Sequence, residues 1–125
     1  MPTPDELRSL IDHYVNTINQ RDPAAIAALF AEDGVQADPA SQPANIGRSA
    51  IAEFFVNGIA ASEDWTFEAT NVHTCASTVA FDFAIAIRLG EGTMQVSGIE
   101  VFEIDGSGLI ASAQAYWDDT DVSFA

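Results

Sequence analysis

The first sixty residues of the chain carry apolar side chains at helical spacing. Thr3-Pro4-Asp5-Glu6 has the pattern of a capping box with proline at the first helical position, and the apolar positions that follow recur every three or four residues: Leu7, Leu10, Ile11, Tyr14, Val15 and Ile18. This spacing predicts a helix from Pro4 to about Gln20. Asp22-Pro23 is a second start signal, which predicts a short helix that ends near Asp33-Gly34.

A third helix is expected after a short extended stretch. Val35 to Ala37 is a strand candidate, and Asp38-Pro39 ends it. Ser49 is then expected to cap a helix, whose buried stripe consists of Ile51, Phe54, Phe55 and Ile59.

The hydrophobic period changes from helical to alternating after Ser62, which is typical of strands with one buried face. The first of four strands begins at Trp65. The second places six apolar residues on one face: Val79, Phe81, Phe83, Ile85, Ile87 and Leu89. Two glycine-containing turns, at 90–92 and 105–108, then connect to a third strand at 93–104 and a fourth at 109–117.

Helices that precede strands in this way indicate an α+β fold. With 125 residues and no internal repeat or linker, we expect one domain over residues 1–125. Three helices packed on one face of a long, curved, mainly antiparallel sheet would form a cone. A pocket inside that cone follows from the expected topology.

Charge and hydropathy exclude two classes of partner. The chain has 19 acidic residues against four arginines and no lysine, which gives a formal net charge of -15. Nucleic acids require a basic patch and anionic membranes require a polybasic segment, so we expect neither as a partner. No apolar run approaches the ~18 residues of a membrane span, and the amino terminus lacks the order of a signal peptide, so we expect a cytoplasmic protein.

Cysteine and histidine give no sign of a metal or a thiol nucleophile. Cys75 is the single cysteine, so no internal disulfide can form. His13 and His73 lie far apart without the spacing of zinc ligands. His73 and Cys75 share a strand face, but the sequence shows no third group to orient them. We therefore expect no metal site.

Two polar residues fall on apolar faces. Tyr14 lies within the apolar stripe of the first helix, where a buried hydroxyl needs a partner or a wet cavity. Glu100 shares its strand face with Met94, Val96 and Phe102. A carboxyl buried there would stay protonated and could donate a hydrogen bond. The alternatives are a core tyrosine bonded to a backbone carbonyl, and a glutamate at the sheet's outer rim or paired with Arg88.

Asp38 is a third candidate. The residue before a proline is held in the extended region, so this carboxylate is presented from a stiff loop. Taken alone, such a residue is more often an ordinary turn residue than a catalyst.

Together, these residues resemble the bacterial ketosteroid isomerases, of the nuclear transport factor 2-like superfamily. The similarity covers nearly the whole chain and rests on Tyr14, Asp38-Pro39, Glu100 and Gly47 with five segments around them: Tyr14 to Asp22, Ala28-Leu29-Phe30-Ala31-Glu32-Asp33, Ala50-Ile51-Ala52-Glu53-Phe54-Phe55, Gly98-Ile99-Glu100-Val101-Phe102 and Ala115-Tyr116-Trp117. The resemblance implies an α+β cone and a homodimer. The outer face of the sheet, with Ile99 and Val101, is the surface we expect between the two copies.

The resemblance also implies a reaction. Asp38 would be the general base, and Tyr14 and protonated Glu100 would be the oxyanion-hole donors; a carboxylic acid kept neutral by apolar surroundings is an established feature of that family. Asp38 would move a proton from carbon 4 to carbon 6 of a 3-oxo-Δ5-steroid, without a cofactor or metal. A neutral steroid needs an apolar slot, for which the candidate walls are Phe54, Phe55, Phe83 and Trp117.

Two departures from the family bear on the natural substrate. The family usually has Asp where this chain has Glu100, and commonly has Tyr where it has Phe55. Other functions on the same fold are a polyketide-cyclase-like or epoxide-hydrolase-like enzyme, and a module that binds an apolar ligand without turnover.

Overall fold

The structure is a computed structural model that describes residues 2–125, and three helices precede most of its sheet. The helices are α1 (Pro4–Gln20), α2 (Pro23–Ala27) and α3 (Arg48–Ala60). The strands are β1 (Phe30–Ala37), β2 (Asn45–Ile46), β3 (Asp64–Cys75), β4 (Thr78–Leu89), β5 (Gly92–Ile104), β6 (Ile110–Tyr116) and β7 (Val122–Phe124), and a 3-10 helix, η1 (Asp119–Asp121), precedes β7.

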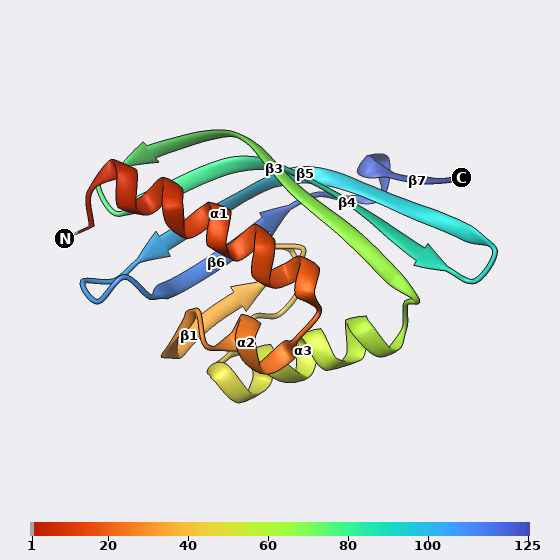
Figure 1. Ribbon diagram of the computed structural model, residues 1–125, viewed down its shortest axis with the longest axis horizontal. Coiled ribbons are helices and arrows are strands. Elements are labelled where there is room, and N and C mark those ends of the chain that lie inside the picture. Colours follow the sequence, from red (N-terminus) through yellow and green to blue (C-terminus); the bar gives the residue numbers. More distant parts are fainter. Residues whose placement is uncertain (1) are drawn as a thin grey trace.

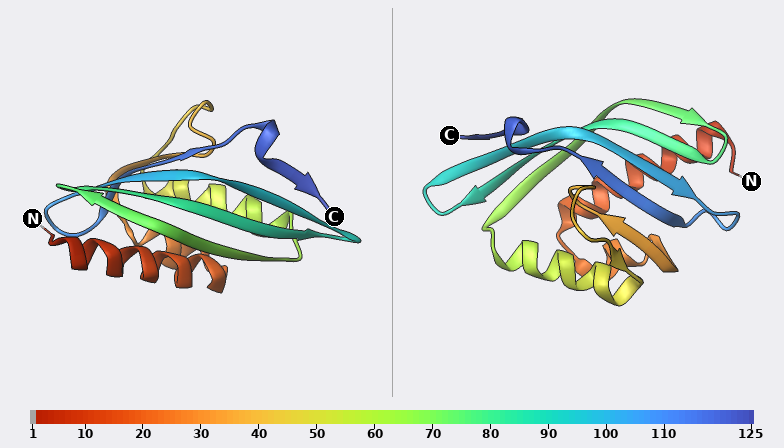
Figure 2. Two further views of the ribbon diagram at one scale, coloured as in Figure 1. Left: turned by 90° about the horizontal axis from the view of Figure 1, so that it is seen from above. Right: turned by 180° about the vertical axis from the view of Figure 1, so that it is seen from behind.

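One curved sheet contains all of these strands. Its order is β2-β1-β6-β5-β4-β3, with β7 paired to β5, and β1–β6 is the parallel pair among antiparallel neighbours. Helix α1 packs along β3, while α3 packs against α2 and β1 (Figure 1). Figure 2 shows the long strands β3, β4 and β5 bending together over the helices. The expected α+β cone is thus confirmed.

The first helix has the expected boundaries because its ends are specified locally. The Thr3 hydroxyl accepts a hydrogen bond from the Glu6 N–H at 3.2 Å, and the Glu6 carboxylate accepts one from the Thr3 N–H at 2.9 Å. This capping box satisfies two N–H groups that the helix itself leaves free. Four residues of the predicted stripe are buried against the core, and they are Leu7, Ile11, Tyr14 and Ile18.

Two predicted boundaries are wrong. The second helix ends at Ala27 instead of continuing to Asp33-Gly34, because fully buried Phe30 pairs with Ile110 of β6 and starts β1. The third helix begins at Arg48 after Gly47, so Ser49 lies inside its first turn and does not cap it. The short elements β2, η1 and β7 have no counterpart among the elements that the hydrophobic pattern predicts.

The core lies between α1 and the concave face of the sheet. Three aromatic rings at its centre, Tyr14, Phe81 and Phe102, meet edge to face: Tyr14 and Phe102 at a centroid distance of 4.9 Å, and Phe81 and Phe102 at 5.2 Å. Phe81 and Phe102 are at most 1% exposed, so this part of the core is closely packed.

Candidate active site

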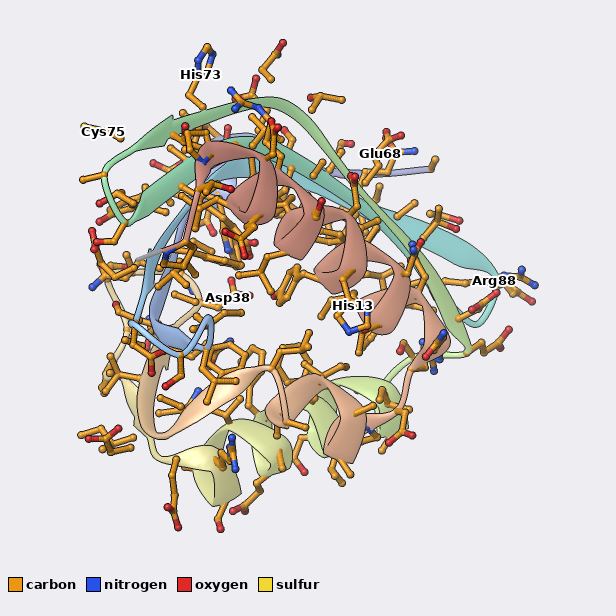
Figure 3. All side chains as sticks on the ribbon, turned by 60° about the vertical axis from the view of Figure 1, so that its left-hand side comes forward. His13, Asp38, Glu68, His73, Cys75 and Arg88 are labelled. Carbon is orange, nitrogen blue, oxygen red and sulfur yellow. The ribbon has the colours of Figure 1, made fainter. Side chains whose placement is uncertain are left out.

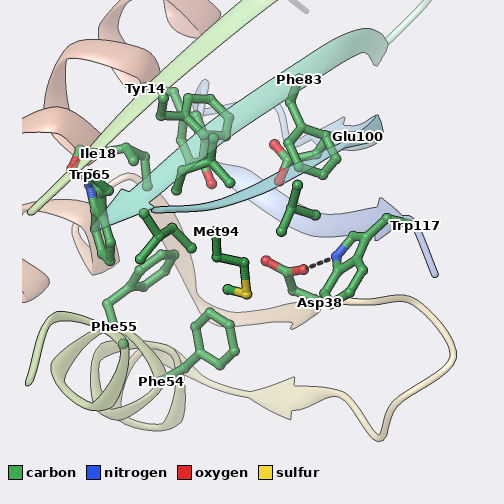
Figure 4. A pocket seen from close by; sticks show the side chains of 15 residues that line it. Tyr14, Ile18, Asp38, Phe54, Phe55, Trp65, Phe83, Met94, Glu100 and Trp117 are labelled. Carbon is green, nitrogen blue, oxygen red and sulfur yellow. Dashed lines mark hydrogen bonds between the residues drawn. The ribbon is translucent and has the colours of Figure 1, made fainter. Parts of the chain in front are cut away.

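A cavity of about 210 Å³ lies between the concave face of the sheet and the helices (Figure 4). Fifteen residues line it, and they come from α1, α3, β3, β4 and β5 and from the segments that follow β1 and β6. Three of them carry a hydroxyl or a carboxyl group, and they are Tyr14, Asp38 and Glu100. The structure therefore brings the three candidate catalytic residues to one cavity, although the first and the last are 86 positions apart in the sequence.

Tyr14 reaches the cavity from the middle of α1. Its side chain is 4% exposed, and its ring packs edge to face on Phe67 and Phe102 at centroid distances of 5.9 and 4.9 Å. Burial raises the pKa of Tyr14 well above its ordinary value, and the nearby Glu100 and Asp38 carboxyls raise it further. At neutral pH this hydroxyl keeps its proton and can donate it in a hydrogen bond.

Glu100 points into the same cavity from β5. Phe81 and Ala115 face it on the neighbouring strands, its side chain is 6% exposed, and its Oε2 atom finds no hydrogen-bond partner among residues 2–125. Burial raises the pKa of Glu100 well above its ordinary value, and the charge of Asp38 adds to this effect. A neutral carboxylic acid is therefore the favoured form, and it is a hydrogen-bond donor.

The two alternative interpretations of Glu100 are wrong. It lies on the concave face rather than at an outer rim, because it is buried among apolar residues. Arg88 lies near the opposite end of β5, where it pairs with Thr93 and approaches the exposed Asp64 carboxylate at 4.0 Å.

Asp38 follows the last residue of β1 and is half-buried. The indole N–H of Trp117 donates a hydrogen bond to Asp38 Oδ1 at 2.6 Å (Figure 4). The segments that carry Asp38 and Trp117 are held side by side in two ways. Ala37 pairs in parallel with Gln114, and the Ala40 N–H donates a hydrogen bond to the Ala115 carbonyl at 2.7 Å. Burial raises the pKa of Asp38, and the bond from Trp117 opposes this by stabilising the carboxylate.

The four candidate wall residues all line the cavity. Phe54 and Phe55 project from α3 and meet edge to face at 5.2 Å, Phe83 comes from β4, and Trp117 follows β6. The sequence analysis placed Phe54 in the buried stripe of its helix, but it is half-buried because it faces the cavity.

Sequence reasoning missed a glycine that shapes this wall. A Cβ atom on Gly98 would lie 2.3 Å from the Tyr116 carbonyl oxygen and 2.9 Å from the Phe83 ring. No side chain fits there, so Gly98 lets β6 and the Phe83 ring approach β5 closely. Gly98 lies two residues before Glu100 and therefore on the same strand face, and this position was the available signal.

Sequence reasoning also missed the rest of the lining. Ile18 and Gly58 on the helices complete the cavity wall together with six residues of the strands: Trp65, Phe67, Ile85, Ile87, Met94 and Val96. Their alternation on the strands had indicated one common face, but it did not say which of them border empty space.

The remaining reactive side chains lie away from the cavity. Figure 3 shows His73 and Cys75 at one end of the β3–β4 pair and Arg88 at the other, with Asp38 in the interior. Cys75 is exposed. No three His, Cys, Asp or Glu residues between positions 2 and 125 are grouped as metal ligands would be. Over the same range, no helix is both long and apolar enough to cross a membrane.

The fold and the cavity define a class of protein. This chain belongs to the SnoaL-like domain family, whose model matches residues 11–113. It is also 32% identical over 117 residues, 94% of each chain, to the Steroid Delta-isomerase of Nocardioides simplex.

Two solved structures share the fold. One is SalBIII, an epoxide hydrolase/cyclase-like enzyme with a role in pyran ring formation in the polyether salinomycin. It matches this chain with a TM-score of 0.90 at 22% identity, over 98% of both chains. Rv0760c from Mycobacterium tuberculosis has a TM-score of 0.88 at 21% identity, over the full length of both chains. These matches place the chain in the nuclear transport factor 2-like cone fold.

Proposed function

We propose that this protein is a steroid delta-isomerase that converts 3-oxo-Δ5-steroids to 3-oxo-Δ4-steroids. The observation that carries the proposal is the convergence of one carboxylate and two neutral donors, Asp38, Tyr14 and Glu100, in an otherwise apolar cavity. The 32% identity to the Nocardioides simplex isomerase supports the same activity. The reaction needs a base, an oxyanion site and an apolar slot, which Asp38, the pair of Tyr14 and Glu100, and the apolar lining of the cavity would provide.

The proposed reaction is an intramolecular proton transfer in two steps. The Asp38 carboxylate removes a proton from carbon 4, and the electrons of the broken C–H bond pass into the ketone to form a dienolate. Tyr14 and Glu100 donate hydrogen bonds to the dienolate oxygen and keep their own protons. Asp38 then returns its proton to carbon 6, which moves the double bond into conjugation and regenerates the carboxylate.

The apolar surroundings strengthen both donors where charge develops. In a site from which water is excluded, a hydrogen bond to a forming oxyanion stabilises the transition state more than the neutral ketone. Removal of one such donor lowers turnover by about 10²–10³-fold in comparable enzymes. Phe55 has no hydroxyl, so it leaves the Tyr14 hydroxyl available to the substrate.

Trp117 is a positioning residue for the base in this scheme. Its N–H bond to Oδ1 fixes the carboxylate and leaves Oδ2 to meet the substrate. Burial and the Trp117 bond act on the pKa of Asp38 in opposite directions, with burial the larger effect. The result is a stronger base than the carboxylate of an exposed Asp, which suits general-base catalysis.

The test is the ultraviolet absorbance of 5-androstene-3,17-dione mixed with the purified protein, because the conjugated product absorbs where the substrate does not. We expect rapid growth of the product band with the wild type and none above background with Asp38→Asn. The Asn side chain keeps the size and the contact with Trp117 but cannot accept the proton. Ligand binding by Asp38→Asn should be retained.

A different result would reassign the protein. Tight binding of 4-androstene-3,17-dione by the wild type, without any isomerisation, would contradict the proposal. It would instead favour a carrier of apolar ligands or an enzyme of the cyclase or epoxide-hydrolase kind on the same fold.

We further propose that the chain is one domain and that two copies form a homodimer through the outer face of the sheet. Ile99 on that face is 47% exposed, and Val101 beside it is half-buried. Sedimentation equilibrium should give twice the mass of one chain, and Ile99→Lys should give the mass of a single chain. A monomeric wild type would contradict this assembly.

A further inference from the structure

The concave face of the sheet is organised in rows of facing residues. The register of β3, β4 and β5 places one lining residue from each strand side by side in two successive rows: Trp65, Ile87 and Met94, then Phe67, Ile85 and Val96. Phe83 and Gly98 follow in the third row, and Phe81 and Glu100 in the fourth. The cavity therefore has a donor end at Glu100 and a far end at Trp65.

A ligand held at the donor end can extend in one direction along the sheet. Beyond Glu100 the core is close-packed, since Val79 and Phe102 of the next row are both 0% exposed. In the other direction, six residues of β5 lead to Met94, a span of roughly 20 Å at the usual rise of a strand. A substrate with its ketone at Tyr14 and Glu100 therefore points its opposite end at the Trp65 row.

Trp65 is held rigidly in that row. Its indole N–H donates a hydrogen bond to the Ile18 carbonyl at 2.8 Å, and the Arg21 guanidinium lies over its ring, 4.6 Å from the centroid. Arg21 in turn donates to the carbonyls of Ile59 and Ser62 at 3.2 and 3.1 Å, which ties α1 to the end of α3. Trp65 is only 9% exposed, whereas Ile87, its neighbour in the row, is half-buried.

The Trp65 ring also closes the space between the sheet and α3. Gly58 lines the cavity from α3, and a Cβ atom placed on it would lie 3.7 Å from Trp65 Cζ3, at ordinary van der Waals distance. The walls of β3 and α3 thus meet at these two residues. Replacing the indole by a small side chain would lengthen the cavity at its far end.

We propose that Trp65 is a specificity-determining residue that closes the far end of the cavity and limits the length of the ligand. This inference rests on the proposed function and narrows its substrate class. The preferred substrates are compact fused-ring ketones whose end opposite the ketone carries no side chain. Trp65 does not contact the reacting atoms in this arrangement, so it acts on which ligands fit rather than on proton transfer.

The experiment compares two 3-oxo-Δ5-steroids that differ at the far end, 5-androstene-3,17-dione and 5-pregnene-3,20-dione, whose acetyl side chain is longer. The quantity of interest is the ratio of kcat/KM for the longer substrate to that for the compact one. Trp65→Val should raise this ratio by about 10-fold or more, the scale for one or more extra carbons in an apolar pocket. Trp65→Phe, which keeps an aromatic ring, is the matched control and should change the ratio far less.

A rescue variant separates the proposed role from a general loss of structure. The Gly58 side-chain position faces the Trp65 ring, so Gly58→Leu added to Trp65→Val should refill the space and bring the ratio back toward the wild-type value. Gly58→Leu alone should lower kcat/KM for the longer substrate more than for the compact one, and this variant serves if Trp65→Val does not fold. An unchanged ratio in the folded variants would overturn the proposal.

A binding measurement distinguishes this proposal from the proposed function. Calorimetry with the product ketones 4-androstene-3,17-dione and progesterone should show the same shift of preference toward the longer ligand in Trp65→Val, whether or not the protein isomerises. Such a shift in binding without turnover would support Trp65 as the length limit and contradict the isomerase. Turnover together with a binding preference that is the same in the wild type and in Trp65→Val would support the isomerase and contradict Trp65 as the length limit.

Discussion

Glu100→Met should make the protein more stable and much less active. Glu100 is 6% exposed, and its Oε2 atom has no partner in the part of the chain that the structure describes. A buried polar atom without a hydrogen bond costs roughly 1–3 kcal/mol. Methionine has the same unbranched length and suits the apolar contacts of Phe81 and Ala115, so that cost disappears without leaving a cavity.

The expected gain in the free energy of unfolding is therefore about 1–3 kcal/mol at pH 7. Each 1 kcal/mol corresponds to roughly 2–8 °C in Tm for domains near this size. Urea denaturation followed by circular dichroism measures the gain directly. In the proposed mechanism the same variant lacks one of the two oxyanion donors, so its kcat should fall by about 10²–10³-fold.

Comparison with Glu100→Gln isolates the role of the donor. The Gln amide still donates a hydrogen bond, so this variant should lose less activity than Glu100→Ala. A Glu100→Met protein that is less stable than the wild type would refute the reasoning, because it would mean that the carboxyl makes favourable interactions in the folded state. A larger loss of activity in Glu100→Gln than in Glu100→Ala would show that the carboxyl acts in an ionised form.

The pH dependence of stability follows from the raised pKa of Glu100. The folded protein holds this proton more tightly than the unfolded chain, so the associated stability is fully present below the unfolded pKa of about 4.3. It is lost as the pH rises through the higher folded-state pKa. The stability advantage of Glu100→Met over the wild type should therefore grow as the pH rises through that window.

Three further substitutions test the remaining parts of the site. Tyr14→Phe should lower kcat by about 10²–10³-fold while the protein stays folded, and an unchanged kcat would remove Tyr14 from the oxyanion site. Trp117→Phe removes the hydrogen bond that lowers the pKa of Asp38, so the acidic limb of the kcat/KM profile should move to higher pH. Tyr116→Phe is the control, because the exposed Tyr116 hydroxyl donates to Gln114 and not to Asp38. Equal pH profiles for the two variants would contradict the positioning role of Trp117. Gly98→Ala should lower the free energy of unfolding by roughly 1–3 kcal/mol, because the added Cβ meets the Tyr116 carbonyl oxygen. A urea midpoint equal to that of the wild type would show that β5 and β6 can move apart at this point without cost.

Local patterns predicted the elements whose causes are local. The capping box and the apolar spacing defined α1 from Pro4 to Gln20, and the structure has the same limits. Alternation placed Glu100 among apolar neighbours, although it could not tell the concave face of the sheet from the convex face. That distinction depends on where the helices pack, and the resemblance to a known family supplied it before the structure did.

The misplaced elements depend on contacts that are distant in sequence. Phe30 continues the helical spacing of its segment, but its pairing with Ile110 outweighs local propensity. Asp38 has the local features of a turn residue, and its interior position follows from Trp117. The need for glycine at position 98 likewise arises from the Tyr116 carbonyl and the Phe83 ring, which no local pattern reveals.

The parallel pairing of β1 with β6 has a consequence for how the protein folds. It joins Asp38 to Trp117 across 79 positions of sequence, whereas the capping box of α1 joins residues three apart. Closing so long a loop is entropically expensive, and contacts of this separation form slowly. During refolding, recovery of ligand binding should therefore lag behind recovery of the helical circular dichroism signal. Binding of the proposed ketone ligand would then report when β1 has paired with β6.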